Sequence, residues 1–364
     1  MITLLSNTII KSAFDSRATN MSEIIQSFEF GDLIPGLPED LAVECVTRLS
    51  FDSLHKAYHV CRRWKELLRS DAFYGYRRAA GFSRKLACLV QVAGVASANK
   101  TTSARIVLFD PVARFFHELD SIPRYECGMP LFCQMVSCDG KIVVMGGWDP
   151  ITYDSIPDVF IYDFVTGAWR EGTPMPDKRT FHAIGAGSAG RVYVAGGHDD
   201  NKNALSSAWV YDVREDKWTQ IAPMSKERDE CEGFVVVNGD GKEEFWVVSG
   251  YGTENQGSFM GDADVYDADS GTWRLEDGVW KAGRCPRGCA GMVEGDVVCW
   301  ANVVGDEARK MGPNMVVVGD QLVATGSDHS GGFYLVELNG GRTERVGVEE
   351  RFSGFVQSSC CVEI

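Results

Sequence analysis

The sequence predicts a mainly β protein: a β-propeller of six blades, with five as the alternative count, and a small helical domain before it. Two observations lead to this prediction. One pattern of residues occurs three times in the middle third of the chain, and a segment of helical periodicity precedes it. A repeat period of about 50 residues is typical of propeller blades, each of which is a four-stranded sheet.

Each copy of the repeat begins with Gly-Gly or Ser-Gly, continues to a Tyr-Asp pair and ends at a tryptophan seven residues after the tyrosine. The copies cover residues 146–169, 196–218 and 249–273, and a fainter one has Phe116 seven residues after Phe109. Short apolar runs before the glycines suit inner strands that are buried on both faces. The tryptophans are expected to fill the wedge between neighbouring blades.

Net charge and cysteine pattern exclude several classes of function. The chain carries −15 in total; residues 1–30 hold two basic and three acidic residues, residues 31–85 hold ten and seven, and residues 86–364 therefore carry −17. An acidic propeller repels phosphate backbones, so we expect no nucleic-acid partner. Twelve cysteines without a CxxC pair indicate free thiols in the cytoplasm or nucleus. No segment has 18 consecutive apolar residues, so we expect no membrane span.

The N-terminal region divides into a leader, residues 1–30, expected to be disordered, and a helical domain, residues 31–80; the propeller follows as residues 81–364. Pro38 stands where a first-turn proline belongs, and apolar residues then recur at helical spacing. A second helix is expected to end near Tyr58, and a third carries Trp64 on its apolar face. Three helices in about 45 residues form a small fold, which indicates that a partner completes the core.

Residues of this helical segment resemble the F-box pattern, in which LPxDL is followed by a spaced leucine and VCKxW. Leu37 to Leu41, Leu49 and Val60 to Trp64 carry the resemblance. It implies that the segment binds a Skp adaptor through Leu37, Pro38, Leu41, Val46, Leu49, Val60, Cys61, Trp64 and Leu67.

An F-box followed by repeats of the kelch type resembles the plant kelch-repeat F-box proteins. The tail, residues 352–364, is similar to the ending of the subgroup that targets phenylalanine ammonia-lyase. The resemblance implies a non-catalytic substrate receptor of a Skp–cullin–F-box ubiquitin ligase, which would restrain phenylpropanoid synthesis by directing that enzyme to the proteasome. Two alternatives remain: a receptor for cytokinin response regulators, and a kelch scaffold without a role in degradation.

Two sets of residues are candidates for substrate binding. Arginines precede strands that open blades, and aromatic residues follow the glycine pairs. In kelch propellers such positions tend to lie on one face near the channel mouth, so the resemblance implies a binding face formed by Arg124, Trp148, Arg179, His198, Arg228, Tyr251 and Arg287. Arginines hold carboxylates in bidentate pairs, and aromatic residues supply apolar anchors. Alternatively, each arginine pairs with an acidic residue of an adjacent blade and only stitches the propeller together.

Catalysis finds little support in the sequence. The six histidines accompany no His-Glu-x-x-His motif, nucleophile elbow or phosphate-binding loop. A copper-radical enzyme on this scaffold would need a Tyr–Cys crosslink and two histidine ligands, a set that cannot be assembled here. We therefore expect no enzyme activity, metal or cofactor.

Overall fold

The computed structural model of the chain describes residues 32–93, 104–125, 128–293, 296–300, 314–325, 332–338 and 342–364. The expected leader, residues 1–30, lies outside this part. The chain separates into two compact units. One, the helical unit, contains the residues up to 85 together with residues 163–168 and 363–364; the other, the propeller unit, contains the rest. Among the described residues, no helix is both long enough and apolar enough to span a bilayer.

The described part of the helical unit contains one helix that the sequence analysis did not predict. The expected three correspond to α2 (Glu39–Thr47), α3 (Phe51–Tyr58) and α4 (Arg62–Arg69), and α5 (Asp71–Ala79) follows directly. The Ser70 hydroxyl caps α5 by accepting a hydrogen bond from the Phe73 N–H at 3.2 Å. Phe73 and Tyr76, three residues apart, bury one face of this helix. Gly75 in its middle lowers its helical propensity, which is why the sequence pattern was weak there.

The propeller unit contains five four-stranded sheets and one two-stranded sheet among the described residues. The first blade joins β22 (Gly354–Glu363), β1 (Lys85–Ala93), β2 (Ala104–Asp110) and β3 (Phe115–Glu118). The second contains β4 (Gln134–Cys138), β5 (Lys141–Met145), β6 (Val159–Asp163) and β7 (Ala168–Gly172). The third contains β8 (Ala183–Ala186), β9 (Arg191–Ala195), β10 (Ala208–Asp212) and β11 (Lys217–Ile221).

The fourth blade contains β12 (Glu232–Val237), β13 (Glu243–Val248), β14 (Ala263–Asp267) and β15 (Thr272–Glu276). The two-stranded sheet of β16 (Ala290–Val293) and β17 (Asp296–Cys299) comes next in the chain. The last complete blade contains β18 (Asn314–Val318), β19 (Gln321–Thr325), β20 (Phe333–Glu337) and β21 (Thr343–Val346). The β-propeller is thus confirmed with five complete blades, and residues 301–313, after the two-stranded sheet, lie outside the described part.

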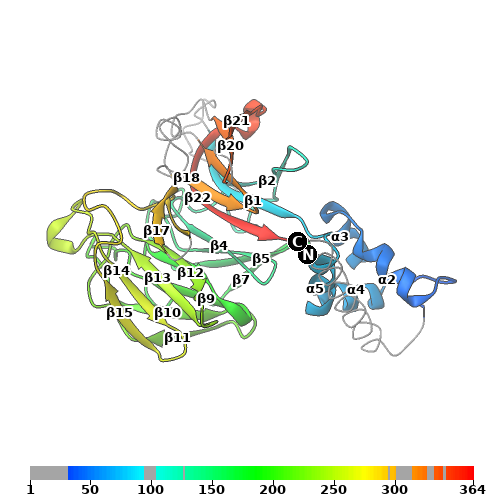
Figure 1. Ribbon diagram of the computed structural model, residues 1–364, viewed down its shortest axis with the longest axis horizontal. Coiled ribbons are helices and arrows are strands. Elements are labelled where there is room, and N and C mark those ends of the chain that lie inside the picture. Colours follow the sequence, from blue (N-terminus) through cyan, green and yellow to red (C-terminus); the bar gives the residue numbers. More distant parts are fainter. Residues whose placement is uncertain are drawn as a thin grey trace, which may run out of the picture. The chain divides into compact units, whose positions relative to one another are not determined.

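The last strand of the chain closes the ring. β22 pairs with β1, so the first blade combines residues from both ends of the sequence. The strand extends from Gly354 to Glu363. In Figure 1, β22, β4, β12 and β18 gather toward the middle of the propeller, whereas β11 and β15 lie at its rim.

The second glycine of each repeat marks a close approach of two backbone segments. A Cβ atom would lie 2.5 Å from the Leu131 carbonyl oxygen at Gly147 and 2.3 Å from the Thr180 carbonyl oxygen at Gly197. Both glycines have positive φ angles, 93° and 80°. Only glycine satisfies both conditions, which explains why the repeat begins as it does.

The repeated tryptophans join neighbouring blades, as the sequence predicted. The indole N–H of Trp169 donates to the Asp120 carbonyl at 2.7 Å, that of Trp218 to Thr173 at 2.8 Å and that of Trp273 to Ala222 at 2.6 Å. Each acceptor belongs to the segment that follows the last strand of the preceding blade. Each ring also packs against the tyrosine of its own repeat, with centroids 4.8–5.2 Å apart.

Trp218→Ala is expected to lower the free energy of unfolding by about 3 kcal/mol, because it removes both the ring packing and the hydrogen bond to the preceding blade. Trp218→Phe retains most of the packing and should cost only about 1 kcal/mol. Denaturant unfolding of the two variants checks this order. Equal stability of Trp218→Ala and the unmodified protein would contradict the claim that Trp218 stabilises the contact between neighbouring blades.

Candidate functional site

The innermost strands of the propeller surround a central channel. Residues of β22, β4, β8, β12, β16 and β18 line one cavity of about 490 Å³. The loops that lead into β4, β8, β12 and β16 surround one mouth of this channel. Within a blade the first and second strands are antiparallel, so the residues before the first strand lie beside the residues after the second strand. The candidate residues Trp148, His198 and Tyr251 follow the second strands, so they belong to this mouth.

Four rings form a continuous cluster at the mouth, hereafter the aromatic cluster: Phe132, Trp148, Phe181 and His198. The centroid of Phe132 lies 5.1 Å from that of Trp148 and 5.3 Å from that of Phe181. Phe181 lies 5.9 Å from Trp148 and 5.6 Å from His198. Phe132, Trp148 and Phe181 are half-buried, so they offer apolar surface to a partner.

Arg287 completes the cluster from another part of the chain. Its guanidinium group lies over the Phe181 ring, 5.2 Å from the centroid, and one N–H donates to the Cys231 carbonyl at 3.2 Å. A cation over an aromatic face is attracted by the ring quadrupole. The structure therefore brings together Trp148, His198 and Arg287 from the predicted set.

Phe132 and Phe181 were not among the predicted site residues. They lie 49 residues apart and both precede an inner strand by two positions. Both have positive φ angles, 55° and 54°. Their separation matches the repeat period, and this signal in the sequence could have identified them.

Arg179 and Arg228 belong to loops at the mouth, but their side chains are fully buried and offer no surface to a partner. Arg179 donates to the carbonyls of Gly196 at 3.1 Å and Ser207 at 3.0 Å. Arg228 donates to the equivalent carbonyl of Ser249 at 2.8 Å. Burial lowers the pKa of Arg179 to about 10. These contacts tie strand ends together within the blade that each arginine precedes, whereas the stitching alternative expected an acidic residue of an adjacent blade.

The other two arginines occupy different places in the repeat. Arg179 and Arg228 stand four residues before β8 and β12, whereas Arg287 stands three before β16 and Arg124 ten before β4. Arg124 pairs with Asp158 at 3.1 Å, and its side chain is half-exposed. The four arginines therefore form no common ring.

His198 and Tyr251 are held by one residue, Asp229. The Nδ1–H of His198 donates to the Asp229 carboxylate at 2.9 Å, and its Nε2 lies 2.7 Å from the Thr180 hydroxyl oxygen. The Tyr251 backbone pairs with that of Asp229 in both directions, at 2.8 and 3.0 Å. The Tyr251 ring meets Phe259 at 5.2 Å. Both candidate residues are nearly buried and rigidly placed.

The predicted adaptor-binding residues divide into an exposed group and a buried group. Leu41 and Val60 expose 51% and 62% of their surface, unusually much for large apolar residues. Pro38 and Cys61 are exposed as well, and Leu37, Leu49 and Trp64 are half-buried. Val46 and Leu67 are each 1% exposed and belong to the core of the helical unit, so they have no surface to offer an adaptor.

Trp64 and Glu39 fix the start of the F-box-like segment. The Trp64 indole N–H donates to the Leu33 carbonyl at 2.8 Å, and Glu39 forms a salt bridge with Arg63 at 2.7 Å. These contacts join α4 to Leu33, which precedes α2, and to Glu39, the first residue of α2. They hold Leu37 and Leu41 in a fixed position relative to α4.

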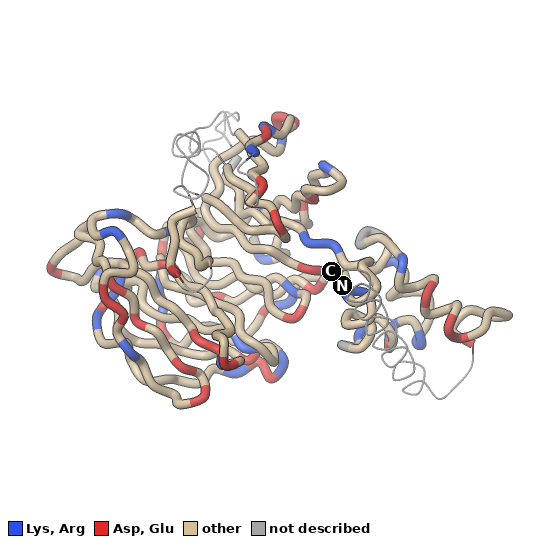
Figure 2. The backbone as a smooth tube through the Cα atoms, viewed as in Figure 1, with Lys and Arg blue, Asp and Glu red and all other residues tan. Residues whose placement is uncertain are grey.

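The described residues contain no group of three or more His, Cys, Asp or Glu side chains that could hold a metal ion. Charged residues of both signs are interspersed over the propeller unit in Figure 2, without a large basic area. At the mouth, the Asp229 carboxylate and the Thr180 hydroxyl hydrogen-bond to the His198 ring and fix its orientation.

Two family models match the chain: the F-box domain over residues 34–75, and the kelch motif over residues 129–176 and 186–225. Curated relatives from Arabidopsis thaliana are similar along much of their length. F-box/kelch-repeat protein At2g44130 is 39% identical over 278 residues, which cover 69% of this chain and 66% of the relative. F-box/kelch-repeat protein SKIP20 is 38% identical over 69% of this chain and 68% of its own length.

A third relative, F-box/kelch-repeat protein At1g80440, is 33% identical, and the match covers 92% of this chain and 100% of the relative. The matches therefore extend over both the helical unit and the propeller. Members of this family are non-catalytic adaptors. The chain belongs to the plant F-box/kelch-repeat protein family.

Proposed function

We propose that the protein is the substrate-recognition subunit of a Skp–cullin–F-box ubiquitin ligase. The observation that carries this proposal is the exposure of Leu41 and Val60 on a helical unit that has a buried core of its own. Both residues stand at positions that the F-box resemblance assigns to adaptor binding, so their exposed side chains are available for that contact. The helical unit binds the Skp adaptor, and the propeller binds the target.

The chain itself forms no bond in the reaction. By holding a target and the ligase in one complex, it converts ubiquitin transfer into an effectively intramolecular step. The aromatic cluster and Arg287 are the proposed target-binding face. Aromatic residues and arginine are enriched among the residues that dominate binding energy at protein interfaces.

We propose phenylalanine ammonia-lyase as the target, on the resemblance of residues 352–364 to receptors of that enzyme. Within the fold these residues build β22, and two of them act inside the propeller. Gln357 accepts the Phe132 N–H at 2.8 Å, and the Ser358 hydroxyl accepts the Met135 N–H at 3.1 Å. Direct contacts with the enzyme are therefore assigned to the mouth and not to the tail.

Trp148→Ala combined with Arg287→Glu is expected to weaken binding of purified phenylalanine ammonia-lyase by about a hundredfold or more, because two central contacts are lost. Adaptor binding should be unchanged, since neither residue belongs to the helical unit. Val237→Ala is the matched control: this residue is 67% exposed, at the other end of β12 from the mouth. Biolayer interferometry with immobilised full-length protein measures both affinities.

The outcomes separate the receptor proposal from its target. If the unmodified protein binds the adaptor but not phenylalanine ammonia-lyase, the target assignment fails and the receptor proposal stands. If it does not bind the adaptor, the receptor proposal fails. Full retention of the enzyme by the double variant would place recognition elsewhere than the aromatic cluster.

A further inference from the structure

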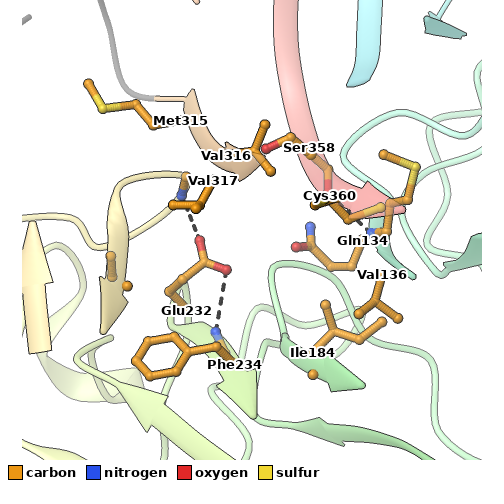
Figure 3. Close-up of a pocket in the computed structure, with 18 of the residues that line it drawn as sticks. Gln134, Val136, Ile184, Glu232, Phe234, Met315, Val316, Val317, Ser358 and Cys360 are labelled. Carbon is orange, nitrogen blue, oxygen red and sulfur yellow. Dashed lines mark hydrogen bonds between the residues drawn. The ribbon is translucent and has the colours of Figure 1, made fainter. Parts of the chain in front are cut away.

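Among the described residues that line the central cavity, two are charged and the others are neutral. Glu232 at the start of β12 and Arg287 before β16 both line it, and the remaining lining residues are polar-neutral or apolar. Figure 3 shows the Glu232 carboxylate on one side of the cavity, joined by dashed lines to two backbone N–H groups, with Gln134 across the open space. The volume, about 490 Å³, lies in the range of small-molecule sites.

The charge of Glu232 is not required by its structural contact. Its Oε2 accepts the Gly288 N–H at 2.6 Å and thereby joins two inner strands. Gln357 makes the equivalent bridge to the Phe132 N–H at 2.8 Å with a neutral amide. The two donors share a left-handed backbone, with φ angles of 66° at Gly288 and 55° at Phe132. A glutamine at position 232 would thus serve the fold equally well.

Neither charged group is neutralised by a salt bridge within the described part of the chain. The second oxygen of Glu232 has only a long contact, 3.3 Å, with the N–H of Gly233. Arg287 makes one hydrogen bond, to Cys231, of the five that a guanidinium group can donate. Burial raises the pKa of Glu232, and the nearby Arg287 acts in the opposite direction. A charge that is withdrawn from water is unfavourable unless opposite charge compensates it, and a bound cation at Glu232 would add such compensation.

We propose that the cavity binds a small zwitterion of the amino-acid class, with its ammonium group on Glu232 and its carboxylate on Arg287. The cavity is lined by one acidic residue, Glu232, and one basic residue, Arg287, among neutral residues. A molecule with one positive and one negative group complements this charge pattern. Carboxylates and guanidinium groups form strong charge-assisted hydrogen bonds with such partners. Arg287 also contacts Phe181, so an occupant would reach the base of the aromatic cluster. This inference stands independently of the proposed ligase role.

The test uses the full-length protein and the twenty L-amino acids, each titrated singly by isothermal calorimetry. We expect saturable binding of at least one amino acid with one-to-one stoichiometry. Its N-acetyl derivative, which lacks the cation, and its methyl ester, which lacks the anion, should each bind about tenfold more weakly or worse, since each lacks one charge-assisted contact. Absence of binding by all twenty, or binding of either derivative as tightly as the parent amino acid, would overturn the proposal.

Glu232→Gln should weaken the same ligand about tenfold or more while leaving the unfolding midpoint at or above that of the unmodified protein. The amide retains the bridge to Gly288, as Gln357 does in the first blade. Ser137→Ala is the matched control, because it alters the same cavity wall without changing its charge. Unchanged affinity in Glu232→Gln would refute the assignment. The ligand derivatives test the unmodified protein, so the conclusion does not depend on any variant folding.

Discussion

Arg228→Met is expected to lower the free energy of unfolding by about 3–5 kcal/mol, the usual cost of removing one partner from a buried ion pair. The Arg228 side chain is fully buried and donates to Asp264 at 2.8 Å and to Asp262 at 2.7 Å. Asp264 is fully buried too, so the substitution leaves its carboxylate without its main counter-charge. Methionine fills similar volume but supplies no donor to the Ser249 carbonyl. Denaturant unfolding followed by tryptophan fluorescence measures the loss.

Two further variants make the test specific. Arg124→Met removes a salt bridge whose arginine is half-exposed, and Asp158 keeps the Tyr125 hydroxyl as a donor, so the change should cost about 1 kcal/mol. Adding Asp264→Asn to Arg228→Met removes the orphaned charge and should restore part of the stability. If Arg228→Met were as stable as Arg124→Met, the ion pairs of Arg228 with Asp262 and Asp264 would contribute little to the free energy of unfolding, contrary to the prediction.

The blades could be predicted from the sequence because their requirements repeat. Gly147 and Gly197 approach equivalent backbone oxygens in successive blades. The tryptophans at positions 169, 218 and 273 each donate to a carbonyl just after the last strand of the preceding blade. A constraint that recurs every 49 to 55 residues appears as a pattern in the chain. The sheet β16–β17 lacks the Gly-Gly, Tyr-Asp and Trp pattern, so the repeat did not predict it as part of a blade.

The candidate site was less predictable because residue type does not reveal burial. Arg179 and Arg287 both precede an inner strand, by four and three residues respectively. The side chain of Arg179 is buried within its blade, whereas that of Arg287 contacts the aromatic cluster. Phe181 is the centre of the aromatic cluster, but a phenylalanine before a strand is most often ordinary packing. The contacts that distinguish it come from Phe132 and Arg287, 49 and 106 residues away.

Helical periodicity has the same limit in the helical unit. Leu41 and Val46 both follow the apolar pattern of α2, and both fit the F-box resemblance. The structure exposes 51% of Leu41 and 1% of Val46. Because a helix this short can bury one side and dock with another, periodicity cannot say which apolar residue serves the core and which serves a partner.

Leu41→Asp and Val60→Asp are each expected to weaken Skp adaptor binding by about a hundredfold or more while leaving the helical unit folded. Burying a large aliphatic side chain contributes about 1.5–3 kcal/mol, and placing a carboxylate in an apolar contact adds a further cost. Both side chains are more than half-exposed in this chain, so the substitutions disturb little of its own packing. Pull-down with purified adaptor and far-ultraviolet circular dichroism report binding and folding on one preparation.

Two controls separate docking from stability. Val112→Asp makes the same change at an apolar residue of the propeller unit that is 74% exposed, and it should leave adaptor binding intact. Leu67→Ala removes a core residue that is 1% exposed and should lower helical stability by about 2–5 kcal/mol, with adaptor binding lost only as the helices unfold. If Leu41→Asp and Val60→Asp both retained the adaptor at full affinity in a folded state, the F-box would not dock through its exposed apolar residues. The receptor proposal would then lose the observation on which it rests.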